Sequence, residues 1–409
     1  MDETYERVLR EIKKPNRDHA RRLLQCLVVA IRPLRVEELA EVIAVDFDDE
    51  EGIPKLKLSW RWEDQGQALL TSCSSLITIV GTGRSRIVQF SHFSVKEFLT
   101  SARLSTSSQD VSRYHIVLAP AHAILAEICL SIFLHNLIED SNNEKRSPLA
   151  GYAEEHWVRH AQLAGVASRI KGIEYLFASD KPYFSAWCQS RDIDTRPGFS
   201  HGSALRLFVP YSKSGATPLY YAALCGLSNF VEQLIVKYPQ HVNAIGGYYM
   251  TPAVAALAGR YFTLAQVLHR NGSSLEPRGD MGYSPLHSAV VKGDLEMAQV
   301  LLDYGVDVNA QTDARSTSLL MASWHFDDSD LGVVRLLLDH GADPNIQPRS
   351  GETPLHRASR DGKIEMARLL VEHGASVELQ DDRDRTPIDI ASELQHDDIV
   401  KLLLEHRKL

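Results

Sequence analysis

Histidine pairs are the residues of this sequence whose type and spacing first suggest chemistry. His156 and His160 lie four positions apart, so a helix would present both imidazoles on one face, a spacing that suits zinc. Trp157 follows His156 where the H-E-x-x-H motif has glutamate, and no third ligand is evident. We therefore interpret the pair as part of a packed polar face and predict no metal site.

The sequence lacks the usual motifs of covalent catalysis and of phosphate binding. The sequence has no G-x-S-x-G segment and no G-x-x-x-x-G-K-[ST] phosphate loop, and the run Gly81 to Arg86 resembles the latter only in glycine content. The paired carboxylates Asp327-Asp328 and Asp381-Asp382 fall in expected loops, where we predict that they are solvated. The sequence thus predicts a protein that is not an enzyme and has no cofactor. The scattered cysteines form no C-x-x-C pair and are predicted to be reduced, mostly buried thiols: Cys26, Cys73, Cys129, Cys188 and Cys225.

A recurring phrase organises the second half of the chain. The phrase Thr353-Pro354-Leu355-His356 has relatives at Thr217-Pro218-Leu219-Tyr220, Ser284-Pro285-Leu286-His287 and Thr386-Pro387-Ile388-Asp389. A glycine after the phrase recurs at 226, 259, 293 and 362, at intervals of 33, 34 and 69 residues, the last spanning two repeats. The intervening repeat has the variant Thr317-Ser318-Leu319-Leu320 and a few extra residues within 324–331. A period of this length predicts a repeat array.

Each part of the phrase has a structural role. Proline at the first helical position gives up no useful hydrogen bond, and the threonine or serine before it caps the free amides. The glycine ends the first helix in the left-handed conformation. The rings of His287 and His356 are expected to bond backbone between repeats. Phrase and period resemble ankyrin repeats, and the resemblance implies six units: 216–249, 250–283, 284–316, 317–352, 353–385 and 386–409.

The sequence of the first 110 residues predicts helices, then a two-stranded wing, then another helix. This order of elements is a winged-helix pattern. Strand-like runs at 76–80 and 87–91 flank Gly81-Thr82-Gly83 and predict a hairpin. Asn16 is the expected cap of the second helix. Apolar periodicity places the helices at 2–14, 16–32, 35–43, 65–73 and 93–104.

A helical connector is predicted for 111–215. A polar linker at 105–110 precedes it, and its last part, 191–215, has no periodicity. The apolar stretch Ile116 to Ile138 contains His122, Glu127 and His135, so we expect a buried helix there and no membrane span. The expected fold class is therefore mostly α: a winged-helix and helical N-terminal module followed by an ankyrin-repeat solenoid.

The N-terminal region also resembles the winged-helix part of fungal NACHT-type STAND ATPases. The resemblance rests on the run Phe90-Ser91-His92-Phe93-Ser94-Val95-Lys96-Glu97-Phe98-Leu99, and on the order of segments 2–9, 34–40 and 152–161. In that family a nucleotide-binding module precedes this region, and a winged-helix histidine contacts the phosphates of the nucleotide. His92 is the matching position. Because this chain has no phosphate loop, the resemblance implies a STAND-like architecture without its ATPase, in which His92 is vestigial and caps a helix.

Charge is distributed unevenly along the chain. The formal net charge is −9, and by count residues 216–409 hold 17 of the 44 Lys/Arg and 26 of the 53 Asp/Glu. An acidic array argues against direct nucleic-acid binding and allows a basic protein partner. The start Met1-Asp2-Glu3-Thr4 is unlike a signal peptide. We therefore expect an intracellular protein, cytoplasmic or nuclear, that does not bind membranes.

Aromatic and arginine side chains on the repeats are the candidate contacts with a protein partner, because such residues anchor interfaces. Hairpin tips and the first-helix face, which line the concave side of an ankyrin array, are the expected places. The insertion at Trp324 either fills the gap made by its extra residues or binds a partner, and both interpretations stay open, as they do for the Tyr248-Tyr249 pair. The candidates are Tyr248, Tyr249, Arg260, Tyr261, Met281, Tyr283, Arg315, Trp324, His325, Phe326, Arg349 and Arg360.

Three functions are compatible with this sequence. The first is a non-catalytic scaffold or regulator that binds a protein through its ankyrin repeats. The second is a nuclear transcriptional co-regulator that acts through protein contacts. The third is a fragment of a nucleotide-dependent STAND switch without its ATPase domain.

Overall fold

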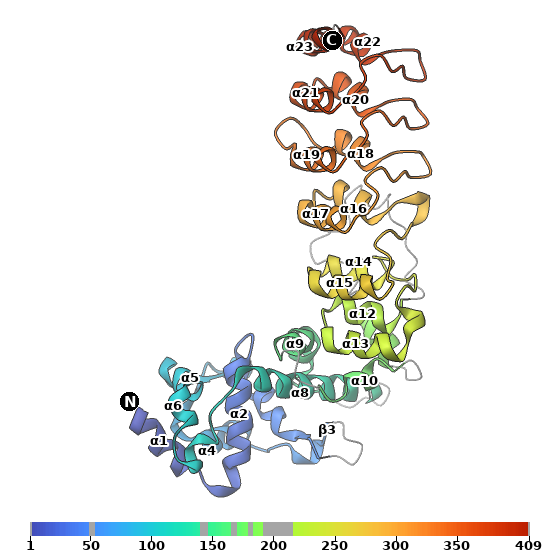
Figure 1. The fold of residues 1–409 in the computed structure, drawn as a ribbon. Coiled ribbons are helices and arrows are strands. Elements are labelled where there is room, and N and C mark those ends of the chain that lie inside the picture. Colours follow the sequence, from blue (N-terminus) through green and yellow to red (C-terminus); the bar gives the residue numbers. More distant parts are fainter. Residues whose placement is uncertain are drawn as a thin grey trace. The chain divides into compact units, whose positions relative to one another are not determined.

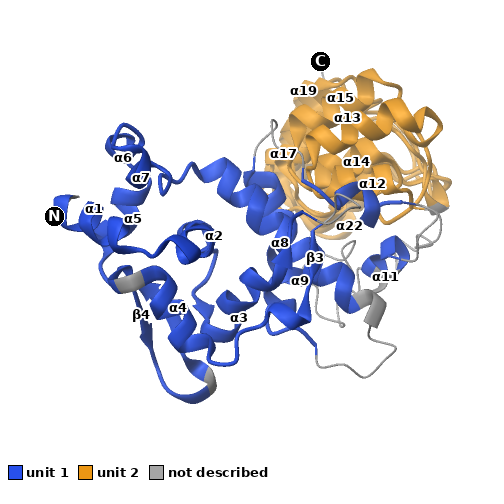
Figure 2. Cartoon of the chain, turned by 90° about the horizontal axis from the view of Figure 1, so that it is seen from below, with its two compact units in different colours: residues 1–192 blue, residues 193–409 orange. Residues whose placement is uncertain are grey.

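A computed structural model describes residues 2–48, 54–139, 146–164, 170–178, 183–190 and 216–407. The chain divides into two compact units, residues 1–192 and residues 193–409 (Figure 2). The irregular segment expected at 191–215 lies outside the described residues.

The first unit is mainly helical and contains the expected wing. Strands β4 (Ile77–Val80) and β5 (Ile87–Phe90) pair antiparallel, with Ile77 opposite Phe90 and Val80 opposite Ile87. The turn between them places Gly81 at φ 96°, a conformation that glycine adopts readily. Its helices are α1 (Asp2–Glu11), α2 (Arg17–Val29), α3 (Val36–Glu41), α4 (Gln65–Cys73), α5 (Phe93–Leu99), α6 (Ala102–Ser105), α7 (Gln109–Ser112), α8 (Leu118–Glu139), α9 (Ala150–Leu163), α10 (Ile173–Leu176) and α11 (Tyr183–Ser190).

Several local expectations for this unit are wrong. Arg35 does not begin a helix, because β1 (Leu34–Arg35) pairs with β5 and makes the sheet order β1-β5-β4. A second ribbon, β2 (Val45–Asp46) with β3 (Lys55–Leu56), was not expected at all. The side chain of Asn16 makes no capping hydrogen bond, and α2 ends at Val29, short of the expected Arg32. The expected linker at 105–110 overlaps the ends of α6 and α7.

The apolar stretch in the connector forms the long helix α8. Its segment Leu118–Asn136 is long and apolar enough to cross a membrane by length and composition, yet 61% of it is buried in the protein. It packs on α9 and on α2, and Leu125, Ile128 and Ile132 are fully buried. This packing is that of a core helix in a globular unit, as the sequence predicted.

Over its described residues, 216–407, the second unit consists of six stacked helix pairs joined by loops that project on the side of the first helices (Figure 1). Equivalent helices of neighbouring pairs pack on each other, as α12 does on α14, α16 on α18 and α20 on α22, and Leu286, Leu301 and Leu355 are fully buried. The pairs are α12 (Pro218–Leu224) with α13 (Ser228–Lys237), α14 (Pro252–Ala258) with α15 (Phe262–Arg270), α16 (Pro285–Val291) with α17 (Leu295–Asp303), α18 (Ser318–His325) with α19 (Gly332–Asp339), α20 (Pro354–Asp361) with α21 (Ile364–Glu372), and α22 (Pro387–Glu393) with α23 (Asp397–His406).

The recurring phrase starts each first helix as expected. The hydroxyl before the helix accepts a hydrogen bond from the amide three residues on, at Thr217, Thr251, Ser284, Thr317, Thr353 and Thr386.

The position of the residue that ends the first helix differs from the expected one in the second repeat. The left-handed position is Gly226, Gly293 and Gly362 in three repeats, but it is Arg260 in the second, where φ is 66°. Gly259 has an ordinary φ of −77°. The equivalent residue is therefore one position later than the glycine spacing indicated. Gln395 occupies the same position in the last repeat, with φ 61°.

Candidate protein-binding surface

The hairpin tips of the array form one hydrogen-bonded row. Asp313 donates its amide to the Met281 carbonyl at 2.9 Å, and Arg349 donates to the Ala314 carbonyl at 3.2 Å. The amide of Asp382 continues the row to the Ser350 carbonyl at 3.2 Å. Four tips are thus held at fixed spacing by their own backbone, which makes them a preorganised surface.

Three tip residues that are not glycine have a backbone in the left-handed region. Met281, Arg315 and Asp384 have φ values of 59°, 63° and 59°. Such a conformation costs a residue with a Cβ roughly 1–2 kcal/mol. At the equivalent place of the neighbouring tip the chain uses Gly351, with φ 71°. Met281 and Arg315 are among the contacts predicted from the sequence, whereas Asp384 is not.

Six of the predicted contact residues are exposed on the array: Arg260, Met281, Arg315, Trp324, His325 and Arg349. Met281 is 56% exposed and Trp324 42% exposed. Arg315 and Arg349 are also exposed, and neither forms an ion pair with a carboxylate of the described part of the chain. These four side chains are exposed members of the predicted set, and none of them is held in an ion pair with a described residue.

Two predicted arginines are engaged within the array. Arg260 lies 3.0 Å from Asp294 and 2.6 Å from Glu296, at the start of helix α17 in the next repeat. Arg360 forms an ion pair with Glu352. Their guanidinium groups tie neighbouring segments together, so a partner would have to compete with these carboxylates.

Three predicted aromatic contacts are packed instead of open. Tyr283 is only 8% exposed, so its expected place on an open surface is wrong. The ring of Tyr261 fills the space where Gly226 and Gly259 lack side chains, since a Cβ at either would lie 2.5 Å from it. Phe326 packs on Gly293 in the same way, with its ring 3.6 Å from a Cβ built there. For Phe326 the gap-filling interpretation is the one that these contacts support.

The insertion after Trp324 also supports the following repeat. The carboxylate of Asp328 accepts hydrogen bonds from the amides of Glu365 and Met366, at 3.0 and 2.9 Å. These amides open helix α21, whose own N-cap residue, Lys363, has no side-chain acceptor. Asp328 is therefore a helix cap supplied from the preceding repeat, and the expectation that it is merely solvated is wrong. His325 lies near Lys363, and partial burial together with that ammonium lowers the pKa of its ring.

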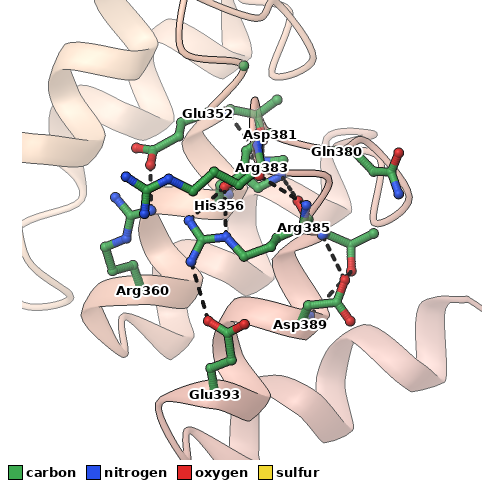
Figure 3. A network of polar contacts seen from close by, with 12 residues as sticks. Glu352, His356, Arg360, Gln380, Asp381, Arg383, Arg385, Asp389 and Glu393 are labelled. Atoms are coloured by element: carbon green, nitrogen blue, oxygen red, sulfur yellow. Dashed lines mark hydrogen bonds and ion pairs between the residues drawn. The ribbon is translucent and has the colours of Figure 1, made fainter.

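A second carboxylate is buried where solvation was expected. Asp381 has a fully buried side chain that accepts hydrogen bonds from the amides of Arg383 and Arg385 and pairs with the Arg385 guanidinium at 2.8 Å. The same guanidinium reaches Glu393 at 3.3 Å, so it links the last tip to helix α22 (Figure 3). Although burial opposes ionisation, these donors hold the pKa of Asp381 down at about 2.

The histidines of the phrase have the structural role predicted for them. Nδ1 of His287 accepts from the Ser284 amide at 3.1 Å, and Nε2 lies 3.3 Å from the Ser316 carbonyl. The ring of His356 repeats the arrangement with Thr353 and Arg385. Burial lowers the pKa of His287 to about 4, so the ring is neutral at physiological pH.

Tyr220 takes over this role in the first repeat. Its hydroxyl accepts the amide of Tyr249 at 3.0 Å, and its ring lies against Gly247. The rings of Tyr248 and Tyr249 are half-buried beside Lys292, a residue that the sequence did not single out. A lysine in a helical repeat has no local signature of such a contact, so only the fold reveals it.

His92 is an exposed helix cap in the first unit. Its Nδ1 accepts the amide of Ser94 at 3.3 Å, and the Ser94 hydroxyl lies 2.8 Å from the hydroxyl of Tyr5. This geometry confirms the capping role that was expected for His92.

The His156–His160 pair is packed, not open. Nε2 of His160 lies 2.8 Å from the Tyr152 hydroxyl, and its Nδ1 lies 2.8 Å from Nδ1 of His122. Burial lowers the pKa of His160 to about 3. The packed polar face predicted here is confirmed. Within the described ranges, no three His, Cys, Asp or Glu residues are grouped so that they could hold a metal ion.

Comparison with protein families agrees with this architecture. Residues 236–312 and 319–408 match ankyrin repeats, and residues 5–109 match the winged helix domain of GPI inositol-deacylase. The chain therefore carries an N-terminal winged-helix domain and C-terminal ankyrin repeats, and the fold class expected from the sequence is confirmed. Neither domain is itself catalytic, and ankyrin repeats bind proteins.

Two curated fungal proteins are similar to the chain. Azaphilone pigments biosynthesis cluster protein L of Monascus ruber is 30% identical over 292 residues, which are 67% of this chain and 60% of that protein. Ankyrin repeat protein nuc-2 of Neurospora crassa is 26% identical over 108 residues, which are 26% of this chain and 10% of that protein. The match thus spans about 60% of the first relative and far less of the second.

Proposed function

We propose that the chain is a non-catalytic regulator or scaffold that binds a protein partner through the concave surface of its ankyrin array. The observations that carry the proposal are the row of hairpin tips, joined backbone to backbone, and the exposure of Trp324 and Met281. A rigid row loses little conformational entropy on binding, and exposed Trp, Met and Arg side chains are enriched in the cores of interfaces.

The contact residues in this proposal are Met281, Arg315, Trp324 and Arg349. His325 and Arg260 lie on the same repeats, Tyr249 and Arg360 lie on the adjoining ones, and all four would contribute at the rim or after rearrangement. We do not retain Tyr283, which is buried.

The winged-helix domain is the reason for proposing a regulatory role. Its resemblance to STAND proteins, together with the match of residues 5–109, supports an origin in such a switch. His92 then serves as a helix cap alone. Added ATP or ADP should leave the melting temperature unchanged, whereas a rise at millimolar nucleotide would favour the switch function instead.

Variants of the exposed residues test the binding surface. The double change Trp324→Ala with Arg349→Glu should release a partner that co-purifies with the chain from its native cells, because it removes an anchor and reverses a charge. Val236→Ser is the matched control, since Val236 is 84% exposed on the second helix α13. If the double variant keeps its partners, or if Val236→Ser loses them as well, the proposed surface is wrong.

A further inference from the structure

Two tyrosines of the array form a corner with a cation inside it. The rings of Tyr248 and Tyr249 have centroids 5.0 Å apart and planes at 84° to each other. The ammonium of Lys292 lies 5.0 Å from the first centroid and 5.9 Å from the second. Both distances fall within the range of about 6 Å over which an aromatic face attracts a cation.

The position of Lys292 adds a second source of attraction. Lys292 is the C-cap of helix α16, where the negative end of the helix dipole favours a positive charge. No carboxylate in the described part of the array forms an ion pair with its ammonium. The two aromatic faces are therefore the contacts that the structure gives this ammonium.

The corner is preformed by the backbone beneath it. The Tyr249 amide donates to the Tyr220 hydroxyl at 3.0 Å, and the Tyr220 ring occupies the space over Gly247, where a Cβ would lie 2.4 Å away. Met250 follows with a left-handed φ of 67° and a buried side chain. Strain of this kind persists only where the surroundings determine the conformation, and it concentrates at binding sites.

We propose that the corner of Tyr248 and Tyr249 is a binding site for an alkylammonium group of the protein partner, and that Lys292 occupies it in the free chain. This rests on the protein-binding function proposed above and names the chemistry of one contact. An alkylammonium fits because two aromatic faces set at 84° attract a diffuse organic cation, as they do the ammonium of Lys292. The excess of acidic residues on the repeats, 26 against 17 basic, favours a partner with such cations.

The source of the ammonium is a lysine side chain, either unmodified or methylated. Both carry the same charge on the same alkyl chain, so they share this site. Methylation spreads the charge over more surface and weakens hydration, which lowers the cost of moving the cation onto the rings.

The test uses the full chain with 13C-labelled tyrosine rings and follows their resonances by NMR. The probes are tetramethylammonium chloride, N-acetyl-lysine amide and its trimethylated form, with sodium chloride at equal ionic strength as the reference. We expect the signals of Tyr248 and Tyr249 to shift with each organic cation. Lys292→Ala should raise the affinity by roughly threefold, because it removes the internal competitor.

Two variants separate the site from general charge effects. Lys401→Ala removes the same charge from an exposed position on helix α23 and should leave the affinity as it is in the wild type. Tyr248→Leu should lower the affinity of the Lys292→Ala protein at least threefold, whereas Tyr248→Phe keeps an aromatic face and should not.

The proposal is overturned if Lys292→Ala binds the organic cations no better than Lys401→Ala, or if Tyr248→Leu binds as well as Tyr248→Phe. Unchanged melting temperatures show that each variant is folded. The probes need no partner, so failure here leaves the proposed function standing, and loss of the partner by the Trp324 variants is measured separately.

Discussion

The cap that Asp328 provides to the next repeat gives a quantitative prediction. Replacing Asp328 with alanine leaves the amides of Glu365 and Met366 without their acceptor. Loss of a helix cap costs about 1 kcal/mol, and loss of a carboxylate at the positive helix end costs a further 0.3–1 kcal/mol or so. We expect helix α21 to be destabilised by about 1–2 kcal/mol.

Native-state hydrogen exchange measures this effect locally. A change of 1–2 kcal/mol in the opening equilibrium accelerates exchange of the α21 amides about five- to thirty-fold. Helix α17 is the internal reference, since its cap, Asp294, belongs to its own repeat and accepts the Met297 amide at 3.1 Å. Its exchange should change much less than that of α21.

Matched variants make the prediction specific. Asp327→Ala removes the same charge one position earlier, where the carboxylate accepts only from Ser329 in its own loop. Asp328→Asn keeps an acceptor of similar capping strength and should lose less than half of the effect. Equal exchange of α21 in Asp328→Ala and Asp327→Ala would show that the insertion does not cap the helix.

Three further predictions concern stability. The pKa of His287 is about 4 in the folded array and 6.5 in the reference state, so between these values the unfolded chain binds one proton more. The free energy of unfolding should therefore fall as the pH drops from 6.5 to 4, be flat above pH 7, and depend less on pH in His287→Asn when measured by urea titration. Tyr152→Phe removes the hydrogen-bond partner of the Ile31 amide and of the buried His160 ring, and should lower the unfolding free energy of the first unit by about 1–3 kcal/mol in the same assay. Gly362→Ala should lower the melting temperature more than Gly293→Ala: both have left-handed φ values, but a Cβ at 362 lies 2.9 Å from an imidazole of the next repeat, whereas at 293 it meets a ring at 3.6 Å.

The repeat architecture was readable from the sequence because its determinants are local. A capping hydroxyl, a proline and a left-handed residue act within a few positions of each other, and they recur. The register error in the second repeat has the same origin: Gly259 is a glycine that the fold does not need, while Arg260 adopts the left-handed conformation and is held by Asp294. Residue type alone does not distinguish a strained arginine from a relaxed glycine.

The missed contacts depend on residues far apart in the chain. Asp328 and Asp381 look alike in the sequence as loop acids, yet one caps a helix 37 residues later and the other is buried under Arg385. Tyr283 carries no local sign of its burial by neighbouring repeats. The strand β1 is two residues long, too short for any alternation to reveal it. The sequence therefore predicted a candidate surface on the hairpin tips and first helices. Only the packing of the repeats shows which of its side chains are exposed.

Site-specific photocrosslinking in the native cell tests the central claim most directly. A photoreactive amino acid is placed at 281, 324 or 349 on the proposed surface, or at 236 on the second helix α13. The binding function predicts that the same discrete protein is crosslinked from the three surface positions and not from 236. Crosslinks from 236 alone, or no common product from 281, 324 and 349, would contradict it.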